Sequence, residues 1–260
     1  MITSKTQHSL PRIAAITGGA SGIGAAVARH LGSQGARIVI CDLDAEASSN
    51  TVAELERLHI EASAVPIDVT SSDSVAKAFE RVQKLHDRCD ILVNCAGVAK
   101  VYPFLEFPLE NWQRTMDVNV TGTLLCSQHA GRMMVKNGWG RIINIASVAG
   151  MRAVGVGRTA YGSSKGALIA LTRQMAVELA PHGVTANAVC PGPVDTPLTK
   201  TLHSEKFRNE YTRAIPMARY GSPDEVAAVA AFLASQAASY VTGIAMPVDG
   251  GFLAAGARPD

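Results

Sequence analysis

Short apolar runs alternate with longer amphipathic segments along almost the whole chain. The apolar runs are rich in β-branched residues and are bounded by Gly, Asp or Pro, which is typical of buried strands. They occupy residues 12–17, 36–41, 63–68, 90–95, 140–146, 184–190 and 243–249. Patterns typical of helices lie between them, at residues 23–34, 45–58, 71–88, 111–137, 160–180 and 223–235. The pattern therefore predicts an α/β fold, a single-domain doubly wound parallel sheet of about seven strands with helices on both faces.

The chain gives no sign of a second domain. No internal repeat, low-complexity tract or linker interrupts residues 1–260, so we expect one domain with a flexible tail at residues 1–10. One long segment, residues 193–222, lacks a strand pattern and is rich in Pro, Thr and charged residues. Its place between the sixth strand and the next helix favours a lid or substrate loop over a linker.

Composition and net charge limit the classes of partner that we expect this protein to bind. Of the 260 residues, 47% are hydrophobic and 18% are charged, a balance that argues against disorder and fits a buried parallel sheet or an extensive subunit interface. The net charge is +2 and the Lys and Arg residues are scattered, so we expect neither nucleic acid nor a membrane as a partner. No apolar leader and no long uninterrupted apolar run occurs, from which we expect a soluble cytoplasmic protein.

The cysteines do not have the spacing of a metal site. Cys41, Cys89, Cys95, Cys126 and Cys190 are far apart, with no CxxC pair and no His at zinc-ligand spacing. We expect small buried side chains in a reducing compartment and no metal site.

The first predicted strand ends in TGGASGIG, residues 17–24, and a helix follows at once. Glycine lets the chain turn sharply and lets a ligand approach the backbone, and a helix N-terminus offers free N–H groups to a phosphate. The turn, spaced on Gly18, Gly22 and Gly24, favours a dinucleotide site, although glycine also ends strands for structural reasons alone.

Asp42 closes the second predicted strand, after the glycine turn. A carboxylate there can accept hydrogen bonds from the adenosine ribose and repels the extra phosphate of NADP, and neither Leu43 nor the turn offers that phosphate a Lys or Arg. We therefore expect NAD as the cofactor. In the alternative, Asp42 only caps the next helix, a position for which Asp44 is equally suited.

The sequence YGSSK, residues 161–165, places a phenol and an ammonium group four residues apart with only small residues between them. On a helix the two side chains share a face, so both can point into one site. Taken alone, such a pair is more often a solvated helix surface.

Together these motifs resemble the short-chain dehydrogenase/reductase family, whose members have a Rossmann fold. The family's motifs occur in order: TGGASGIG at 17–24, DV at 68–69, NCAG at 94–97, NV at 119–120, INIAS ending at Ser147, YGSSK at 161–165, PGPVDT at 191–196 and VDGG at 248–251. The resemblance runs from about Ile13 to Phe252. Cys95 replaces the usual second Asn of NNAG, and its side chain is expected to pack rather than react. Ala146 stands where the family often has a second serine, which leaves Ser147 as the one candidate for the catalytic hydroxyl.

The resemblance implies a catalytic set of Asn119, Ser147, Tyr161 and Lys165. Tyr161 would act as general acid/base, its pKa lowered by the charges of Lys165 and of the oxidised nicotinamide. Lys165 would also hold the nicotinamide ribose, and Ser147 would hydrogen-bond the substrate oxygen. Asn119 would complete a water relay; a structural bridge for Asn119 and a strand-end cap for Ser147 are the competing roles.

The resemblance also implies a set of cofactor-binding residues. They are Gly18, Ser21, Gly22, Ile23, Gly24, Asp42, Asp68, Val69, Asn94, Ala96, Gly97, Tyr161, Lys165, Pro191, Gly192, Val194 and Thr196. Val194 and Thr196 would meet the nicotinamide carboxamide.

Substrate shape in the family is set by three variable segments, here residues 98–105, 148–160 and 193–222. The middle segment carries Arg152 and Arg158, for which solvent or a subunit contact is favoured over substrate binding.

An NAD preference favours net oxidation. The expected function is an oxidoreductase that transfers hydride between NAD(H) and a small-molecule secondary alcohol, such as a polyol or sugar, or its ketone. An NADH-using 3-oxoacyl thioester reductase is the alternative. A non-catalytic NAD(H)-sensing protein is a third reading, against which the intact catalytic set argues. The resemblance further implies a homotetramer that buries residues 111–137, 160–180 and the C-terminal strand between subunits.

Overall fold

One parallel sheet of seven strands forms the centre of the molecule, in the order β3-β2-β1-β4-β5-β6-β7. The computed structural model describes residues 11–256, so the tail expected at residues 1–10 lies outside the described residues. The strands are β1 Ile13–Thr17, β2 Arg37–Asp42, β3 Ala62–Pro66, β4 Ile91–Asn94, β5 Gly140–Ile145, β6 Val184–Pro191 and β7 Ala245–Val248. The predicted doubly wound parallel sheet is confirmed.

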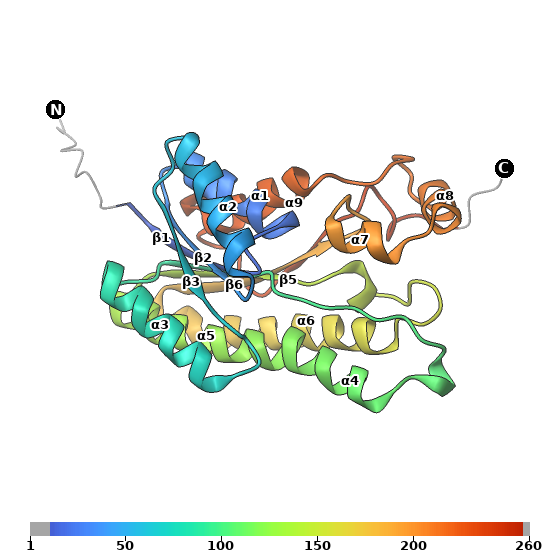
Figure 1. The fold of residues 1–260 in the computed structure, drawn as a ribbon, viewed down its shortest axis with the longest axis horizontal. Coiled ribbons are helices and arrows are strands. Elements are labelled where there is room, and N and C mark those ends of the chain that lie inside the picture. The colour runs from blue at the N-terminus through green and yellow to red at the C-terminus, as the bar shows by residue number, and fades with distance from the viewer. Residues whose placement is uncertain (1–10, 257–260) are drawn as a thin grey trace.

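Helices cover both faces of this sheet (Figure 1). On one face lie α1 Gly22–Ser33, α2 Ala45–Arg57 and α9 Pro223–Ala234, and on the other lie α3 Ser72–His86, α5 Gly122–Asn137 and α6 Thr159–Leu179. Along β1, Ala14 and Ile16 pack into the first core, while Ile13 and Ala15 pack into the second. Because both faces are covered, central strands such as β1 and β4 are nearly continuous apolar runs, which is why the sequence pattern located them.

The helix expected at residues 111–137 is interrupted. It consists of α4 Leu109–Met116, a π-helical turn over Asp117–Thr121, and α5. The π-helical turn contains Asn119, which is fully buried. Such a turn adds one residue to an otherwise regular helix, and hydrophobic periodicity does not reveal it.

The segment at residues 193–222, expected as a loop, contains two helices. These are α7 Pro197–Leu202 and α8 Glu205–Ala214. Their N-termini are capped by the side chains of Thr196 and Ser204. The segment is thus a folded wall beside the sheet.

The strand order reverses next to β1, because the chain runs outward from β1 to β2 and β3 and then returns to β4 on the other side of β1. Loops that leave the carboxyl ends of two such strands diverge and open a crevice, which is where ligands bind in sheets of this kind. The glycine turn after β1, Asp42 at the end of β2, Ser147 after β5 and Pro191 at the end of β6 all belong to this edge.

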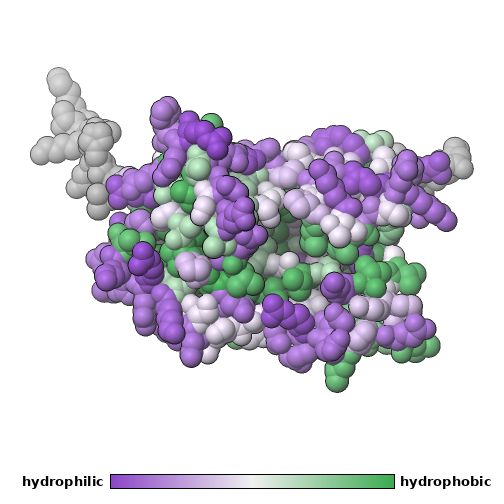
Figure 2. All heavy atoms as spheres, in the orientation of Figure 1, coloured by the Kyte–Doolittle hydropathy of each residue, from purple (hydrophilic) through white to green (hydrophobic). Residues whose placement is uncertain are grey.

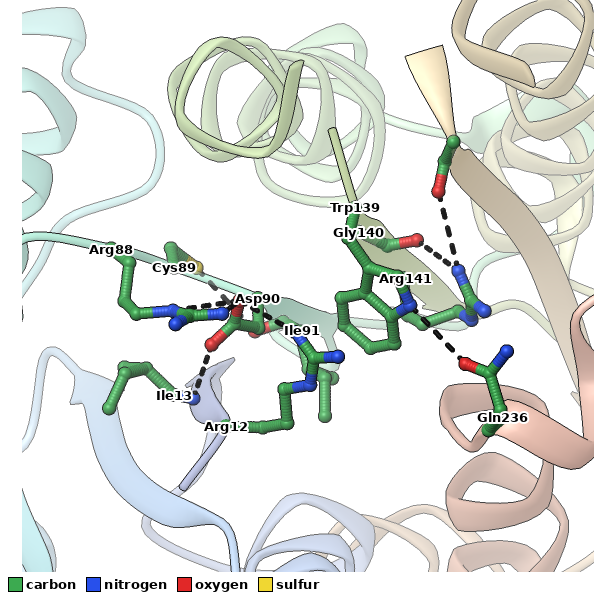
Figure 3. A network of polar contacts seen from close by, with 11 residues as sticks. Arg12, Ile13, Arg88, Cys89, Asp90, Ile91, Trp139, Gly140, Arg141 and Gln236 are labelled. Atoms are coloured by element: carbon green, nitrogen blue, oxygen red, sulfur yellow. Dashed lines mark hydrogen bonds and ion pairs between the residues drawn. The ribbon is translucent and has the colours of Figure 1, made fainter. Parts of the chain in front are cut away.

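A buried charged network closes the opposite edge, where the strands begin (Figure 3). The Asp90 side chain is fully buried, and its carboxylate accepts hydrogen bonds from the Arg88 guanidinium and, at 2.8 Å, from the Ile13 amide. Arg12 lies 3.5 Å from the same carboxylate and stacks over the Trp139 ring. The network joins β1 and β4 far from the crevice.

In the part of the chain that the structure describes, no helix has both the length and the apolar character needed to cross a bilayer.

Candidate active site

A cavity of about 400 Å³ lies in the crevice at the carboxyl ends of the strands. In Figure 2 the surface is hollowed between the two helical layers, with hydrophobic residues in the hollow and hydrophilic residues on the outer helices. Most of the residues expected to bind a cofactor line it: Gly18, Ser21, Gly22, Ile23, Asp42, Asp68, Val69, Ala96, Gly97, Tyr161, Lys165, Pro191, Gly192, Val194 and Thr196. Its volume is in the range of small-molecule sites.

The glycine turn has a backbone that fits a phosphate. Gly18 and Gly22 have positive φ angles of 64° and 53°, which side chains disfavour. A Cβ on Gly18 would lie 2.7 Å from the backbone nitrogen of Ala96, so any side chain would collide with the loop after β4. Ser21 is the N-cap of α1 but makes no side-chain capping bond, whereas Ser71 caps α3. The first amides of α1 therefore remain available to an anion in the cavity.

Asp42 and Asp44 contact different parts of the structure. Asp44 caps α2 by accepting a hydrogen bond from the Ala47 amide at 2.9 Å. Asp42 lines the cavity, and its two oxygens accept from the amides of Ala20 at 3.1 Å and of Asp44 at 3.2 Å. The alternative in which Asp42 caps α2 is therefore wrong. Each Asp42 oxygen keeps the capacity to accept a further hydrogen bond.

Asp68 and Val69 follow β3 and line the same cavity. The Asp68 carboxylate accepts hydrogen bonds from the hydroxyl of Thr70 at 2.7 Å and from its amide at 2.9 Å, and these bonds hold the pKa of Asp68 below its ordinary value. Arg114 donates to the same hydroxyl at 3.1 Å. Asp68 is thus a fixed, ionised acceptor in the cavity wall.

Gly24 and Asn94 lie behind the cavity rather than in its lining. A Cβ on Gly24 would lie 2.1 Å from the carbonyl oxygen of Gly18, so Gly24 permits α1 to pack against the turn. Asn94 is buried and donates hydrogen bonds to side chains of α5 and β5 at 3.0 and 2.9 Å. Both residues therefore support the site from outside its lining.

Asn119 is also outside the lining and bridges two elements of the site. Its Nδ2 donates to the Val98 carbonyl at 3.0 Å and to the Ser164 hydroxyl at 2.9 Å, and its Oδ1 accepts from the Val98 amide at 2.9 Å. Ser164 in turn donates to the Tyr161 carbonyl at 2.8 Å. These bonds tie the loop after β4 to α6. A water relay through Asn119 stays a prediction.

Ser147, Tyr161 and Lys165 meet in the cavity wall. The Lys165 Nζ donates to the Ile145 carbonyl at 2.7 Å and lies 5.7 Å from the centroid of the Tyr161 ring. Ser147 follows β5, and its hydroxyl accepts a hydrogen bond from the Ala149 amide at 3.1 Å. Ser147 and Tyr161 both line this cavity. Lys165 is only 4% exposed, so YGSSK is not a solvated helix surface.

The pKa of Tyr161 differs from the sequence-based expectation. Burial raises the pKa of the phenol above its ordinary value, and the hydrogen bond from Ser147 and the charge of Arg158 oppose this effect. Burial lowers the pKa of Lys165 to about 8. The groups of this chain therefore do not produce the expected low pKa of Tyr161, because loss of water around a buried phenolate outweighs them.

Several lining residues were not predicted from the sequence: Leu43, Ile67, Cys95, Arg114, Val118, Leu198 and Thr199. Burial raises the pKa of the Cys95 thiol to about 11, in agreement with a packing role. Leu198 and Thr199 belong to α7. The Thr196–Pro197 pair, an N-cap followed by Pro at the first helical position, was the signal that could have revealed this helix.

A second cavity of about 80 Å³ adjoins the first at Ser147 and Tyr161. All three variable segments contribute to its walls: Ala99 from the first, Val148, Ala149, Val154 and Arg158 from the second, and Leu198, Leu202, His203 and Tyr211 from the third. Arg158 lies in this wall and Arg152 does not. A solvent or subunit contact for the two arginines stays a prediction. The second cavity lies directly beside the Tyr161 phenol and Ser147.

Residues 18–253 match the family model described as enoyl-(acyl carrier protein) reductase. The chain belongs to the short-chain dehydrogenase/reductase family. It is 41% identical over 241 residues to the 3-oxoacyl-[acyl-carrier-protein] reductase FabG of Aquifex aeolicus (strain VF5), which covers 92% of this chain and 96% of the relative. It is also 41% identical over 244 residues to the 5-keto-D-gluconate 5-reductase of Escherichia coli (strain K12), with 92% and 94% covered. The crystal structure of a gluconate 5-dehydrogenase from Burkholderia cenocepacia J2315, in complex with NADP and tartrate, superposes with a TM-score of 0.90 at 34% identity over 94% of this chain and 96% of that one.

As a short-chain dehydrogenase/reductase, the protein is an oxidoreductase that acts on alcohol or ketone groups of small molecules with a nicotinamide cofactor. The glycine turn and the first amides of α1 fit the phosphates of such a cofactor, and Asp42 fits its adenosine ribose.

Proposed function

We propose that this short-chain dehydrogenase/reductase transfers hydride between NAD(H) and a secondary alcohol, such as a polyol or sugar, or its ketone, with Tyr161 as the general acid/base. The observation that carries the proposal is that Ser147 and Tyr161 both line the two adjoining cavities and so lie at their junction. An oxygen atom bound at this junction meets a hydrogen-bond donor and a proton acceptor in one place.

Each polar group of the junction has a distinct role. When bound, the nicotinamide supplies a hydride acceptor and, in its oxidised form, a positive charge. Ser147 orients the substrate hydroxyl, and Tyr161 as phenolate takes the hydroxyl proton; in the reverse direction the Tyr161 phenol gives that proton to the carbonyl oxygen. Lys165, positioned in the cavity wall by its hydrogen bond to the Ile145 carbonyl, would hold the nicotinamide ribose.

NAD is the proposed form of the cofactor because of Asp42. Its carboxylate lines the cavity next to the glycine turn, where an added ribose phosphate would meet negative charge. The Burkholderia neighbour was solved with NADP, so the preference for NAD rests on Asp42 of this chain.

A second candidate is an NADH-using reductase of 3-oxoacyl thioesters, which the 41% identity to the Aquifex reductase favours. The small volume of the second cavity, walled by residues of α7 and α8, favours the compact alcohol instead.

We also propose a cytoplasmic homotetramer. Apolar side chains are exposed on the elements expected at its interfaces, Leu124 on α5, Val177 on α6 and Ile244 next to β7. Sedimentation of a monomer at micromolar concentration would contradict this assembly.

The proposed reaction is tested by following reduced-cofactor absorbance with NAD or NADP. The substrates are polyols, simple and aryl secondary alcohols, and 3-hydroxyacyl thioesters. Turnover with NAD on one class of alcohol is the expected result. Turnover confined to the thioesters supports the second candidate, and faster turnover with NADP contradicts the role given to Asp42.

A further inference from the structure

The second cavity combines an apolar lining with one strong cation. Ala99, Val148, Val154, Leu198 and Leu202 supply apolar surface on several sides. Arg158 is the one Lys or Arg in its lining. It stands three residues before Tyr161, at the N-cap position of α6, so its guanidinium belongs to the same wall as the reacting phenol.

No carboxylate neutralises Arg158 within residues 11–256. Other arginines of this part of the chain are paired: Arg208 with Asp195, Arg219 with Glu225 and Arg88 with Asp90. The Arg158 guanidinium is half-buried and instead contacts the Nε2 of His203 at 2.9 Å and the ring of Phe207, whose centroid lies 5.5 Å away.

His203 accepts a hydrogen bond from Arg158 but does not balance its charge. Burial and the charges of Arg158 and Arg208 lower the pKa of His203 to about 4, so its ring is neutral at physiological pH. Its Nδ1 contacts the Tyr220 hydroxyl at 3.1 Å, which leaves Nε2 as the acceptor toward Arg158. A neutral ring nitrogen is a weaker partner for a guanidinium than a carboxylate, which forms two charge-assisted bonds in the same plane.

A second donor lines the same cavity. Burial raises the pKa of Tyr211 above its ordinary value, so its phenol keeps its proton. Tyr211 lies on α8 and Arg158 precedes α6, so the two groups come from separate elements at the cavity.

We propose that the Arg158 guanidinium binds a carboxylate of the substrate in the second cavity, which makes the substrate a hydroxy acid or its keto acid. The carboxylate takes the place of the His203 nitrogen as the acceptor, and Tyr211 donates to its second oxygen. Because Arg158 and Tyr161 lie about one helical turn apart, roughly 5 Å along the axis, the carboxylate is only a few bonds from the reacting carbon. The inference rests on the proposed reaction and narrows its substrate class.

Matched substrate pairs test this inference. Gluconate and glucitol, threonate and threitol, and 3-hydroxybutyrate and 1,3-butanediol each differ by the exchange of one carboxylate for hydroxymethyl. For at least one pair, the wild-type protein is expected to prefer the acid about 100-fold in kcat/KM. In Arg158→Gln this ratio falls to within about threefold of unity, and Arg158→Lys keeps part of it because the charge remains without the planar fork. Arg152→Gln, which changes an arginine over Phe252 outside the cavity lining, keeps the wild-type ratio.

Two results overturn the carboxylate site and leave the proposed reaction standing. One is equal turnover of both members of every pair by the wild-type protein. The other is an acid-to-alcohol ratio of kcat/KM that is unchanged in Arg158→Gln. If no pair turns over, calorimetric titration of the protein–NADH complex with each acid shows whether the carboxylate site or the proposed reaction is wrong. Binding that is lost in Arg158→Gln and kept in Arg152→Gln supports the carboxylate site and places the failure in the proposed reaction. Absence of binding at millimolar acid overturns the carboxylate site.

Discussion

Asp42 and Asp44 are separated by one residue, and we expect their substitution to have different effects on cofactor binding. Asp42 lines the cavity and Asp44 caps α2. We predict that Asp42→Asn raises the KM for NAD roughly tenfold and reduces discrimination against NADP, because a hydrogen bond to a charged acceptor and a repulsive charge are both lost. Steady-state kinetics with the two cofactors measure this effect.

Asp44→Asn is the matched control for that measurement. Loss of a capping carboxylate alters the free energy of unfolding by at most about 1 kcal/mol and leaves cofactor preference unchanged. An equal change of preference in both variants would contradict the assignment of Asp42.

The burial of Tyr161 also predicts how kcat/KM depends on pH. Alcohol oxidation needs the phenolate and ketone reduction needs the phenol, and burial raises the pKa of this group. We therefore predict that kcat/KM for oxidation rises about tenfold per unit from roughly pH 6 to pH 8, while kcat/KM for reduction stays flat. The positive charge of Arg158 lowers the pKa of Tyr161, so in Arg158→Gln the rising limb shifts to higher pH. An oxidation rate independent of pH over this range would show that Tyr161 does not take the proton.

The resemblance to the family's ordered motifs was sufficient to place Tyr161, Lys165, Ser147 and Asp42 at one cavity, because they lie at or beyond the carboxyl ends of strands that share one edge of the sheet. The contact between Arg158 and His203 could not be predicted. The two residues lie 45 positions apart, and the helices that bring them together were hidden in a polar segment. The burial that raises the pKa of Tyr161 could not be predicted from the sequence, because burial is a property of the whole fold.

The packing of α1 against the glycine turn offers a test at the level of one element. A methyl group at Gly24 would lie 2.1 Å from the Gly18 carbonyl oxygen, which is backbone and cannot rotate away. We predict that Gly24→Ala pushes the N-terminus of α1 out of place and weakens NADH binding at least about tenfold, because the phosphates lose their donors. Fluorescence titration with NADH measures the affinity, and circular dichroism shows whether the helices persist. Wild-type affinity in a folded variant would contradict the phosphate role of this turn.

Strands were easier to predict than the irregular helices. All seven strands lie within about two residues of their predicted positions, since a strand covered on both faces is a continuous apolar run. α8 was missed because its residues are mostly polar and none of its side chains is fully buried. The π-helical turn at Asp117–Thr121 left no mark in the periodicity, although it holds the buried Asn119.

In the molecule as a whole, the buried charged network around Asp90 and the cavity lie at opposite edges of the sheet. Asp90 is fully buried among the arginines at the amino ends of the strands (Figure 3). We predict that Asp90→Ala lowers the free energy of unfolding by about 3–5 kcal/mol, because buried cationic and amide groups lose their acceptor. Asp224→Ala, which removes an exposed partner of Arg29, costs less than about 1 kcal/mol.

Chemical denaturation measures both changes, and NADH affinity at low temperature shows whether the crevice is intact in Asp90→Ala. Similar stability losses in the two variants would contradict the structural role of the buried network.

The central claim is that Tyr161 transfers the proton in a reaction whose hydride passes to or from the nicotinamide. The most direct test is the turnover of Tyr161→Phe, with NADH binding measured on the same preparation. We expect an unchanged fold, NADH affinity close to wild type, and turnover reduced by about 10²–10⁴-fold on the best alcohol. Turnover within a few-fold of wild type would contradict the role of Tyr161 as general acid/base.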